Sequence, residues 1–220
     1  MITIVTLARY QKVINVLSKR QPDLSILAEA VYKPHNLSAM LRSCDAVGIG
    51  KIYAINPTGG VPTYNETSAS AEKWVELEVL ENVEQMLQIA KVQKMQILAA
   101  HLSDKALDYR EVDYCLPTCI VMGNEKWGVA EATAELVDEH IIIPMMGMVQ
   151  SLNVSVATAV LLFEVQRQRL AAGFYDSPRL NPEEFAKQSF KWLHPREAKR
   201  LDTLGLAYPP LDDEGNISSV

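Results

Sequence analysis

Hydrophobic and polar positions alternate along this chain with two different periods, and each period predicts one kind of element. Apolar residues recur at three- and four-residue spacing where helices are expected, and short runs rich in Ile, Val and Ala predict strands. We expect helices at 8–20, 37–48, 82–94, 129–138 and from about Ser151 to Ala172, and strands at 25–32, 51–56, 74–80, 95–102, 117–124 and 140–145. Asn36 is expected to cap the second helix.

Strands and helices alternate through most of the sequence, which is typical of an α/β fold with a mostly parallel sheet and helices on both faces. Residues 57–73 are rich in turn formers and are expected to form a long loop. Three regions follow: a helical extension at 1–22, an α/β domain at 23–173, and a Pro-containing, partly helical extension at 174–220. The last region has one basic helical stretch, Glu183–Leu201.

Composition indicates an ordinary globular protein. The 220 residues are 48% hydrophobic and 22% charged, enough to bury a sizeable core. Cys44, Cys115 and Cys119 are too few for a disulfide framework and are expected to be reduced thiols. We see no targeting segment, and no apolar run approaches the ~20 residues of a membrane span. A cytoplasmic protein without membrane association is therefore expected.

Charge is distributed unevenly. The net charge is −6, but residues 1–51 carry seven Lys/Arg against three Asp/Glu. Residues 52–143 carry six against fifteen, and residues 144–220 carry eight against nine. A local basic surface suffices for nucleic-acid binding. The pattern permits an RNA partner, although solvated helix faces also explain such runs.

Candidate chemistry lies where strands end. Ligands of open α/β sheets bind beyond the carboxyl ends of the strands, and three predicted strands end in unusual sequence: at His101, at Gly123–Gly128, and at Ile143–Asn153. There is no G-x-G-x-x-G and no phosphate-binding loop signature. These residues alone leave two interpretations open, a small-ligand pocket or tight turns.

Three ordered motifs go further. They are Asn36-x-x-Ala39-x-x-Arg42, then Met122–Gly123–Asn124–Glu125-x-x-Gly128, then Ile143–Pro144–Met145-x-Gly147-x-x-x-Ser151–Leu152–Asn153–Val154–Ser155–Val156–Ala157. Together they resemble the SpoU branch of the SPOUT RNA 2′-O-methyltransferases. The resemblance covers about 8–175, and segments such as Lys33–Pro34–His35–Asn36 are similar to members that act on guanosine 18 in the tRNA D-loop.

The resemblance implies a fold, a cofactor and partners. It implies a SPOUT α/β knot, with a deep trefoil knot at the end of the 23–173 domain, and a homodimer with the active site near its interface. It implies methyl transfer from S-adenosylmethionine to a tRNA ribose, and it implies no metal. The cofactor would be lined by Ala100, Gly123, Ile143 and Leu152, with Asn124, Met145 and Ser151 nearby. The related sequence pattern has Thr at Ala100; if that hydroxyl mattered, about 1 kcal/mol would be lost.

The resemblance also assigns catalytic roles. Arg42 would be the catalytic residue, either as a base or, more consistently with a guanidinium that stays protonated, as a phosphate anchor that stabilises the developing alkoxide. Asn36 would orient Arg42 or the ribose, and Glu125 would hold Arg42 or an N–H group. Ser151 and Asn153 would bind backbone or substrate. Helix capping by Asn36, Ser151 and Asn153, and a solvated Glu125, are the alternatives.

Contacts to RNA are expected from basic residues of the two extensions. These are Arg9, Lys12, Lys19, Arg20, Lys187, Lys191, Lys199 and Arg200. Phosphate contacts by such residues supply affinity but little sequence information. Trp127 would stack on a base or close the cofactor pocket. Ribosomal RNA as the substrate, or a catalytically inactive RNA-binding factor, remain the alternative functions.

Overall fold

The computed structural model describes residues 4–55 and 71–218. The chain divides into two compact units, each described here by itself. The α/β unit is Gln21–Gly173, and the helical unit combines Met1–Arg20 with Phe174–Val220. The loop predicted at 57–73 lies outside the described residues except for its end, which forms the 3-10 turn η1 (Ala71–Lys73).

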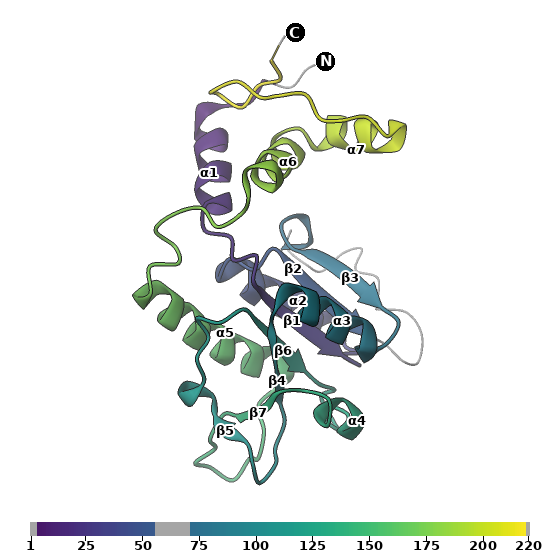
Figure 1. The fold of residues 1–220 in the computed structure, drawn as a ribbon, viewed down its shortest axis with the longest axis vertical. Coiled ribbons are helices and arrows are strands. Elements are labelled where there is room, and N and C mark those ends of the chain that lie inside the picture. The colour runs from purple at the N-terminus through teal and green to yellow at the C-terminus, as the bar shows by residue number, and fades with distance from the viewer. Residues whose placement is uncertain (1–3, 56–70, 219–220) are drawn as a thin grey trace. The chain divides into compact units, whose positions relative to one another are not determined.

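A seven-stranded sheet forms the centre of the α/β unit (Figure 1). Its order is β3-β2-β1-β6-β4-β7-β5, and all neighbouring strands in this order run parallel. The strands are β1 (Leu24–Glu29), β2 (Lys51–Ile55), β3 (Glu76–Leu80), β4 (Gln96–Ala100), β5 (Leu107–Asp108), β6 (Thr118–Met122) and β7 (Glu139–Ile142). The prediction of a mostly parallel α/β sheet is confirmed.

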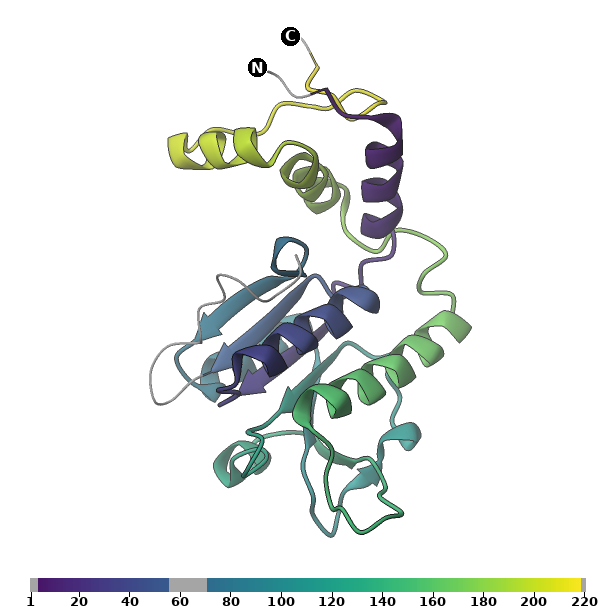
Figure 2. The same ribbon diagram turned by 180° about the vertical axis from the view of Figure 1, so that it is seen from behind.

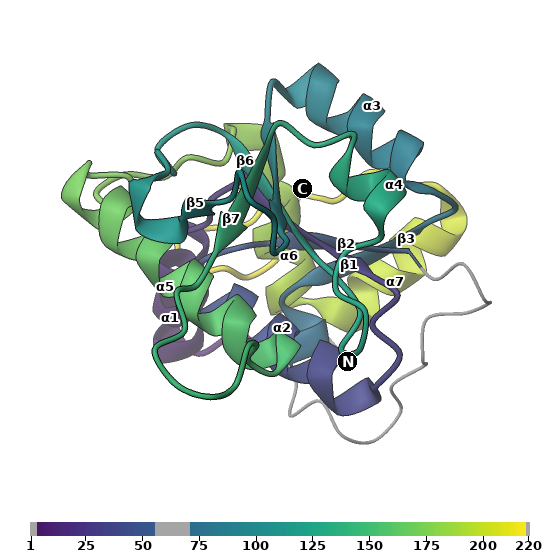
Figure 3. The same cartoon turned by 90° about the horizontal axis from the view of Figure 1, so that it is seen from below.

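Helices cover both faces of this sheet because successive strand side chains point to opposite sides. In β1, Ile26 and Ala28 pack with α2 and α5, whereas Leu27 faces the cluster that contains α3 and α4. Figure 2 shows α2 and α5 side by side, and Figure 3 shows α3 and α4 across the strands from them. The helices are α2 (Pro34–Ala46), α3 (Val83–Gln93), α4 (Glu131–Ala134) and α5 (Val154–Ala171).

Two helix predictions in this unit were wrong in detail. Asn36 is not an N-cap: Pro34, which suits the first helical turn, moves the start of α2 upstream, and Lys33 occupies the cap position without a side-chain bond. The helix predicted at 129–138 is only the four-residue α4. It ends early because Asp138 turns towards the sheet, where its Oδ2 accepts a 2.6 Å hydrogen bond from the Ile97 amide.

The helical unit joins the two ends of the chain. Helix α1 (Leu7–Leu17) packs on α6 (Pro182–Leu193) through Val13, Leu17 and Leu193. The predicted basic helix Glu183–Leu201 is two helices, α6 and α7 (Pro195–Leu204), because Pro195 cannot continue α6 and instead starts α7. The Val5 amide donates to Asn216 Oδ1 at 3.0 Å, so residues from both extensions share one core.

No helix in the described part of the chain combines the length and the apolar character that crossing a bilayer requires.

Candidate active site

Residues from all three sequence motifs meet in one hydrogen-bonded chain. The amide Nδ2 of Asn36 in α2 donates to Glu125 Oε1 at 2.7 Å. Asn153, just before α5, donates from its own Nδ2 to Asn36 Oδ1 at 3.2 Å. Asn36 is 1% exposed, so both of its polar atoms use these partners instead of water. Side chains far apart in sequence therefore form one cluster, which we call the motif cluster.

The arrangement of strands and helices explains why these three side chains lie close together. Strands β1 and β6 are parallel neighbours, so the segments that follow them emerge at the same edge of the sheet. Asn36 comes from the segment after β1 and Glu125 from the segment after β6. Helix α2 packs on α5, which brings Asn153 to Asn36.

Asn153 caps α5, which is one of the two roles that the sequence left open, and it also bonds to Asn36. Its Oδ1 caps α5 by accepting from the Ser155 amide at 2.9 Å, while its Nδ2 holds Asn36. The helix starts at Val154, so Ser151 and Leu152 lie in the preceding loop. Ser151 is exposed and makes no hydrogen bond to the motif cluster among the residues described.

The turn at 123–128 is rigid. Asn124 and Gly128 exchange two backbone hydrogen bonds of 2.8 and 2.9 Å, and Gly128 has φ +71°. A Cβ on Gly123 would lie 2.1 Å from the Gly128 carbonyl carbon, so only glycine fits there. Asn124 ties the turn to the end of β1, because its Nδ2 donates to the Ala30 carbonyl at 2.9 Å. Asn124 Oδ1 also accepts from the Lys126 amide at 2.8 Å.

The sequence analysis missed Glu29. Its carboxylate is 8% exposed at the end of β1, accepts from the Ala130 amide at 2.8 Å, and accepts from the Thr133 hydroxyl. Ala130 is the N-cap of α4 and has no capping side chain of its own, so Glu29 supplies that function from across the sheet. The available signal was a single acid at the end of an otherwise apolar strand, LSILAE.

Candidate cofactor residues gather at the ends of neighbouring strands. Ala100 ends β4, Gly123 follows β6 and Ile143 follows β7, and these strands are adjacent in the order β6-β4-β7. Ala100 and Ile143 are partly buried against the main core. Met145 and Leu152, in the segment between β7 and α5, are also partly buried. Among the described residues, no group of three His, Cys, Asp or Glu could hold a metal ion.

Arg42 lies on the exposed side of α2, whereas Asn36 lies on its buried side. It shares its stripe with His35 and Ala39, at the seven- and three-residue spacing of one helix face. The guanidinium is therefore placed where an external phosphate can reach it.

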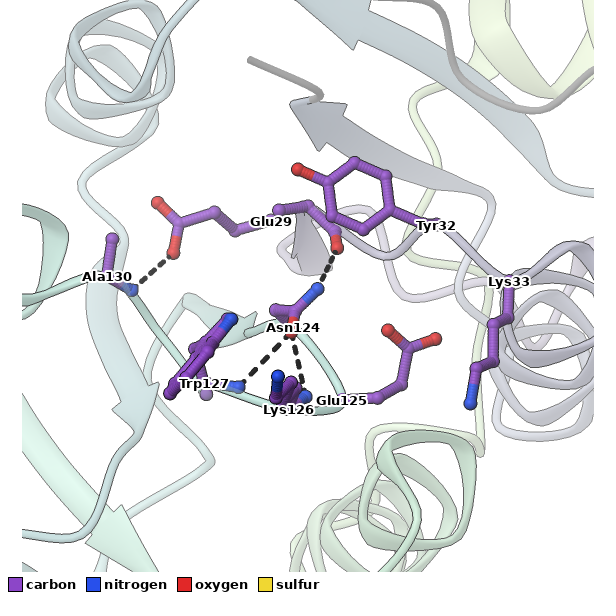
Figure 4. Close-up of a pocket in the computed structure, with 10 residues that line it drawn as sticks. Glu29, Tyr32, Lys33, Asn124, Glu125, Lys126, Trp127 and Ala130 are labelled. Atoms are coloured by element: carbon purple, nitrogen blue, oxygen red, sulfur yellow. Dashed lines mark hydrogen bonds between the residues drawn. The ribbon is translucent and has the colours of Figure 1, made fainter. Parts of the chain in front are cut away.

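A pocket of about 760 Å³ opens beside Glu125 (Figure 4). One wall comes from the segment after β1 and the other from the turn after β6. It is lined by Glu29, Ala30, Tyr32, Lys33, Asn124, Glu125, Lys126, Trp127, Gly128 and Ala130.

Comparison with known proteins places this geometry in a family. The model described as "SpoU rRNA Methylase family" matches residues 23–163, more than half of the chain. The chain belongs to the SpoU rRNA Methylase family. A second model, "SpoU, rRNA methylase, C-terminal", matches residues 167–219, which cover most of the helical unit's C-terminal part.

Individual SpoU relatives are similar over most of the chain. A tRNA (guanosine(18)-2'-O)-methyltransferase of Thermus thermophilus is 55% identical over 188 residues, covering 86% of this chain and 97% of its own length. The crystal structure of an A. aeolicus TrmH/SpoU tRNA modifying enzyme is 43% identical, with a TM-score of 0.80, covering 86% of this chain and 96% of that one. An AdoMet-bound rRNA methyltransferase from Sinorhizobium meliloti is 26% identical, with a TM-score of 0.56, covering 70% and 59%.

The basic residues of this SpoU chain are placed unequally. Lys12, Lys19, Lys187, Lys199 and Arg200 have exposed side chains in the helical unit, and Lys191 is partly exposed. The burial of Arg20 disagrees with the prediction that it contacts RNA: Arg20 is 3% exposed, and its guanidinium lies 5.1 Å from the centre of the Trp192 ring. Arg9 is exposed, and its Nη2 donates to the Trp192 carbonyl at 2.8 Å.

Proposed function

We propose that this protein transfers a methyl group from S-adenosylmethionine to the ribose 2′-hydroxyl of guanosine 18 in tRNA. The observation that carries the proposal is the motif cluster. Asn36, Glu125 and Asn153 come from three separate motifs and are linked by hydrogen bonds beyond the carboxyl ends of β1 and β6. The 55% identical relative with this printed activity supports the choice of substrate.

The residues present fit the proposed cofactor. Gly123 packs closely against the Gly128–Val129 backbone, which holds the end of β6 in a defined position beside the apolar side chains at the neighbouring strand ends. Partly buried Ala100, Ile143, Met145 and Leu152 supply apolar surface suited to an adenine or a thioether. When bound, S-adenosylmethionine supplies an electrophilic methyl group. Backbone of Gly123 and these side chains would hold it in a knotted segment, the trefoil knot that the family resemblance implies.

The chain's own residues would position the acceptor. In the reaction the 2′-oxygen would bond to the methyl carbon while the methyl carbon–sulfur bond breaks, and the hydroxyl proton would pass to water. Arg42 would anchor the phosphate beside the target ribose and stabilise negative charge that develops on the oxygen. Asn36 and Glu125 would fix the neighbouring edge of the site, and Asn153 would hold Asn36 in place.

We also propose a homodimer. Helix α5 leaves Val156, Phe163 and Leu170 about half exposed, at 48%, 51% and 55%, with seven-residue spacing that puts them on one face. In the preceding loop Met146 is 93% and Met148 100% exposed. Contiguous exposed apolar surface of this kind is typical of an interface.

The helical unit is proposed to contact tRNA. It carries ten Lys/Arg and eight Asp/Glu, a net charge of +2, whereas the α/β unit carries eleven and nineteen, a net charge of −8. The two values sum to the net charge of −6 of the whole chain. No disulfide is formed by Cys44, Cys115 or Cys119, which supports a cytoplasmic location of the protein.

The deciding experiment is methyl transfer from labelled S-adenosylmethionine to an unmodified tRNA transcript, with the methylated nucleotide mapped. Wild type should label the ribose of guanosine 18. Arg42→Ala should lower kcat/KM by about 100-fold, the scale of losing one stabilising group in the transition state. Arg110→Ala is the matched control, because Arg110 is exposed, pairs with its near neighbour Asp108, and lies outside the motif cluster.

Two outcomes would contradict the proposal. Transfer to a ribosomal RNA fragment but not to tRNA would favour the alternative substrate. No transfer to either RNA, with a folded protein that is stabilised by S-adenosylhomocysteine, would favour an inactive RNA-binding factor.

A further inference from the structure

The pocket beside Glu125 extends beyond the motif cluster, because Glu125 is the one member of the cluster that lines it. We propose that it holds the guanine base of the target nucleotide, with Glu125 reading the base. The inference rests on the proposed function and deepens it, because it assigns the base specificity of the same site to residues of the α/β unit. About 760 Å³ lies within the range of 300–1,000 Å³ typical of small-ligand sites.

The walls of the pocket are fixed before any ligand arrives. Asn124 ties the turn after β6 to Ala30, and Glu29 holds Ala130 at the far end of the same turn. Both tethers cross from the segment after β6 to the end of β1. A preformed pocket loses little conformational freedom on binding, which favours specific recognition.

Aromatic rings border the opening. Trp127 is 78% exposed and Tyr32 is 40% exposed, one from each wall. The Lys126 Nζ lies 4.5 Å from the centre of the Trp127 ring, a cation–π contact that limits its rotation. Bases in single-stranded RNA loops are recognised by stacking on such rings and by hydrogen bonds to their edges.

Glu125 gives the pocket its preference for guanine. Its Oε1 accepts from Asn36, while Oε2 accepts no hydrogen bond from the residues that the structure describes. Figure 4 shows the carboxylate turned towards the side where Tyr32 and Lys33 lie. Guanine presents two adjacent donors, N1–H and the 2-amino group, which a carboxylate can accept, whereas adenine presents an acceptor at N1.

Two lysines that line the pocket suit the acceptor atoms of guanine. Guanine carries acceptors at O6 and N7, and lysine ammonium groups are common partners for them. Lys33 and Lys126 line the pocket from opposite walls. Since Glu125 also bonds to Asn36, base reading and positioning of the ribose are joined through one side chain.

The test compares tRNA transcripts that carry guanosine, inosine or adenosine at the target position. Inosine lacks the 2-amino group, so wild type should methylate it roughly 10-fold less efficiently, the effect of one lost hydrogen bond to a charged group. Adenosine should be at least about 100-fold worse, because it also opposes an acceptor to the carboxylate. Glu125→Gln should reduce both ratios by about 10-fold, since an amide can pair with either base.

The measured quantities are the ratios of methylation efficiency between guanosine and inosine and between guanosine and adenosine, because Glu125→Gln is also expected to lower the absolute rate. Glu135→Gln, the same change at an exposed position outside the pocket lining, should leave both ratios unchanged. If Glu125→Gln discriminates as wild type does, Glu125 does not read the base and the inference is overturned, while the proposed function stands.

A binding readout separates this inference from the reaction. In the Trp74→Phe/Trp192→Phe protein, Trp127 is the only tryptophan. Its fluorescence should be quenched by tRNA with guanosine at the target position and at least twofold less by tRNA with an abasic site there. Equal quenching would overturn the inference. Guanosine-dependent quenching without methylation of any transcript would support the pocket and remove the proposed function instead.

Discussion

At the scale of single residues, Asn36 is the most constrained member of the motif cluster. It is buried, donates to a carboxylate through Nδ2 and accepts an amide hydrogen bond through Oδ1. Asn36→Asp keeps the shape but places a carboxylate oxygen 2.7 Å from Glu125 Oε1. The expected loss is about 2–4 kcal/mol of unfolding free energy at pH 7, measured by urea denaturation.

The pH dependence of that loss is the sharper readout. Burial beside a second carboxylate raises the pKa of the introduced carboxyl in the folded state, so the folded variant binds a proton more readily than the unfolded one. Its stability should therefore rise relative to wild type as the pH falls from 7 to 5. Asn82→Asp is the control, because Asn82 is an exposed N-cap and Asp caps helices equally well. A pH-independent deficit would argue against the Asn36–Glu125 contact.

The sequence predicted the members of the motif cluster but not their connections. Asn36, Glu125 and Asn153 were found by motif spacing, and the expected role of Asn36 as a cap was wrong. Glu29 could not be found that way, because its importance comes from Ala130 and Thr133, about a hundred residues later. Long-range pairing of this kind depends on strand order, which local periodicity does not encode.

At the scale of elements, α5 carries the most specific prediction. Phe163→Asp puts a charge in the middle of the exposed apolar stripe of α5 and would bury it, unpaired, in the proposed dimer interface. That costs at least about 3 kcal/mol, so the dimer dissociation constant should rise roughly 100-fold. Sedimentation velocity over a concentration series measures it.

Val92→Asp is the matched control, because Val92 is 82% exposed on α3, outside the stripe. Its dimerisation should equal that of wild type. A monomeric wild-type protein, or a Phe163→Asp protein that associates like wild type, would count against the proposed interface.

Element identity was predicted better than element length. All six predicted strands are present, because strands of a parallel sheet that are buried on both faces leave short continuous apolar runs in the sequence. The predicted helix lengths were wrong where single residues decide the ends. Pro34 starts α2 early, Asp138 ends α4 early, and Pro195 divides one predicted helix into two. The two-residue β5 was missed, because Leu107–Asp108 is too short to show any period.

At the scale of the whole molecule, no sequence pattern indicated that the two ends of the chain fold together. Val13 and Leu17 of α1 pack on Leu193 of α6, and no local pattern links segments so far apart. The result is a separate unit with a small positive charge in a chain whose α/β unit is strongly acidic. We propose a corresponding division of roles, with base reading and chemistry in the α/β unit and tRNA backbone contact in the helical unit.

Lys12 and Lys187 test this division. Both are exposed in the helical unit, and if each neutralises one tRNA phosphate, Lys12→Ala or Lys187→Ala should weaken tRNA binding equally for all tRNAs. The slope of log affinity against log salt concentration should fall by about 1 for each, because one fewer counterion is released. The kcat at saturating tRNA should stay unchanged, since neither residue belongs to the motif cluster. Lys91→Ala, an exposed lysine on α3, provides the baseline. If the Lys12 and Lys187 variants keep the wild-type salt slope, neither lysine contacts a tRNA phosphate.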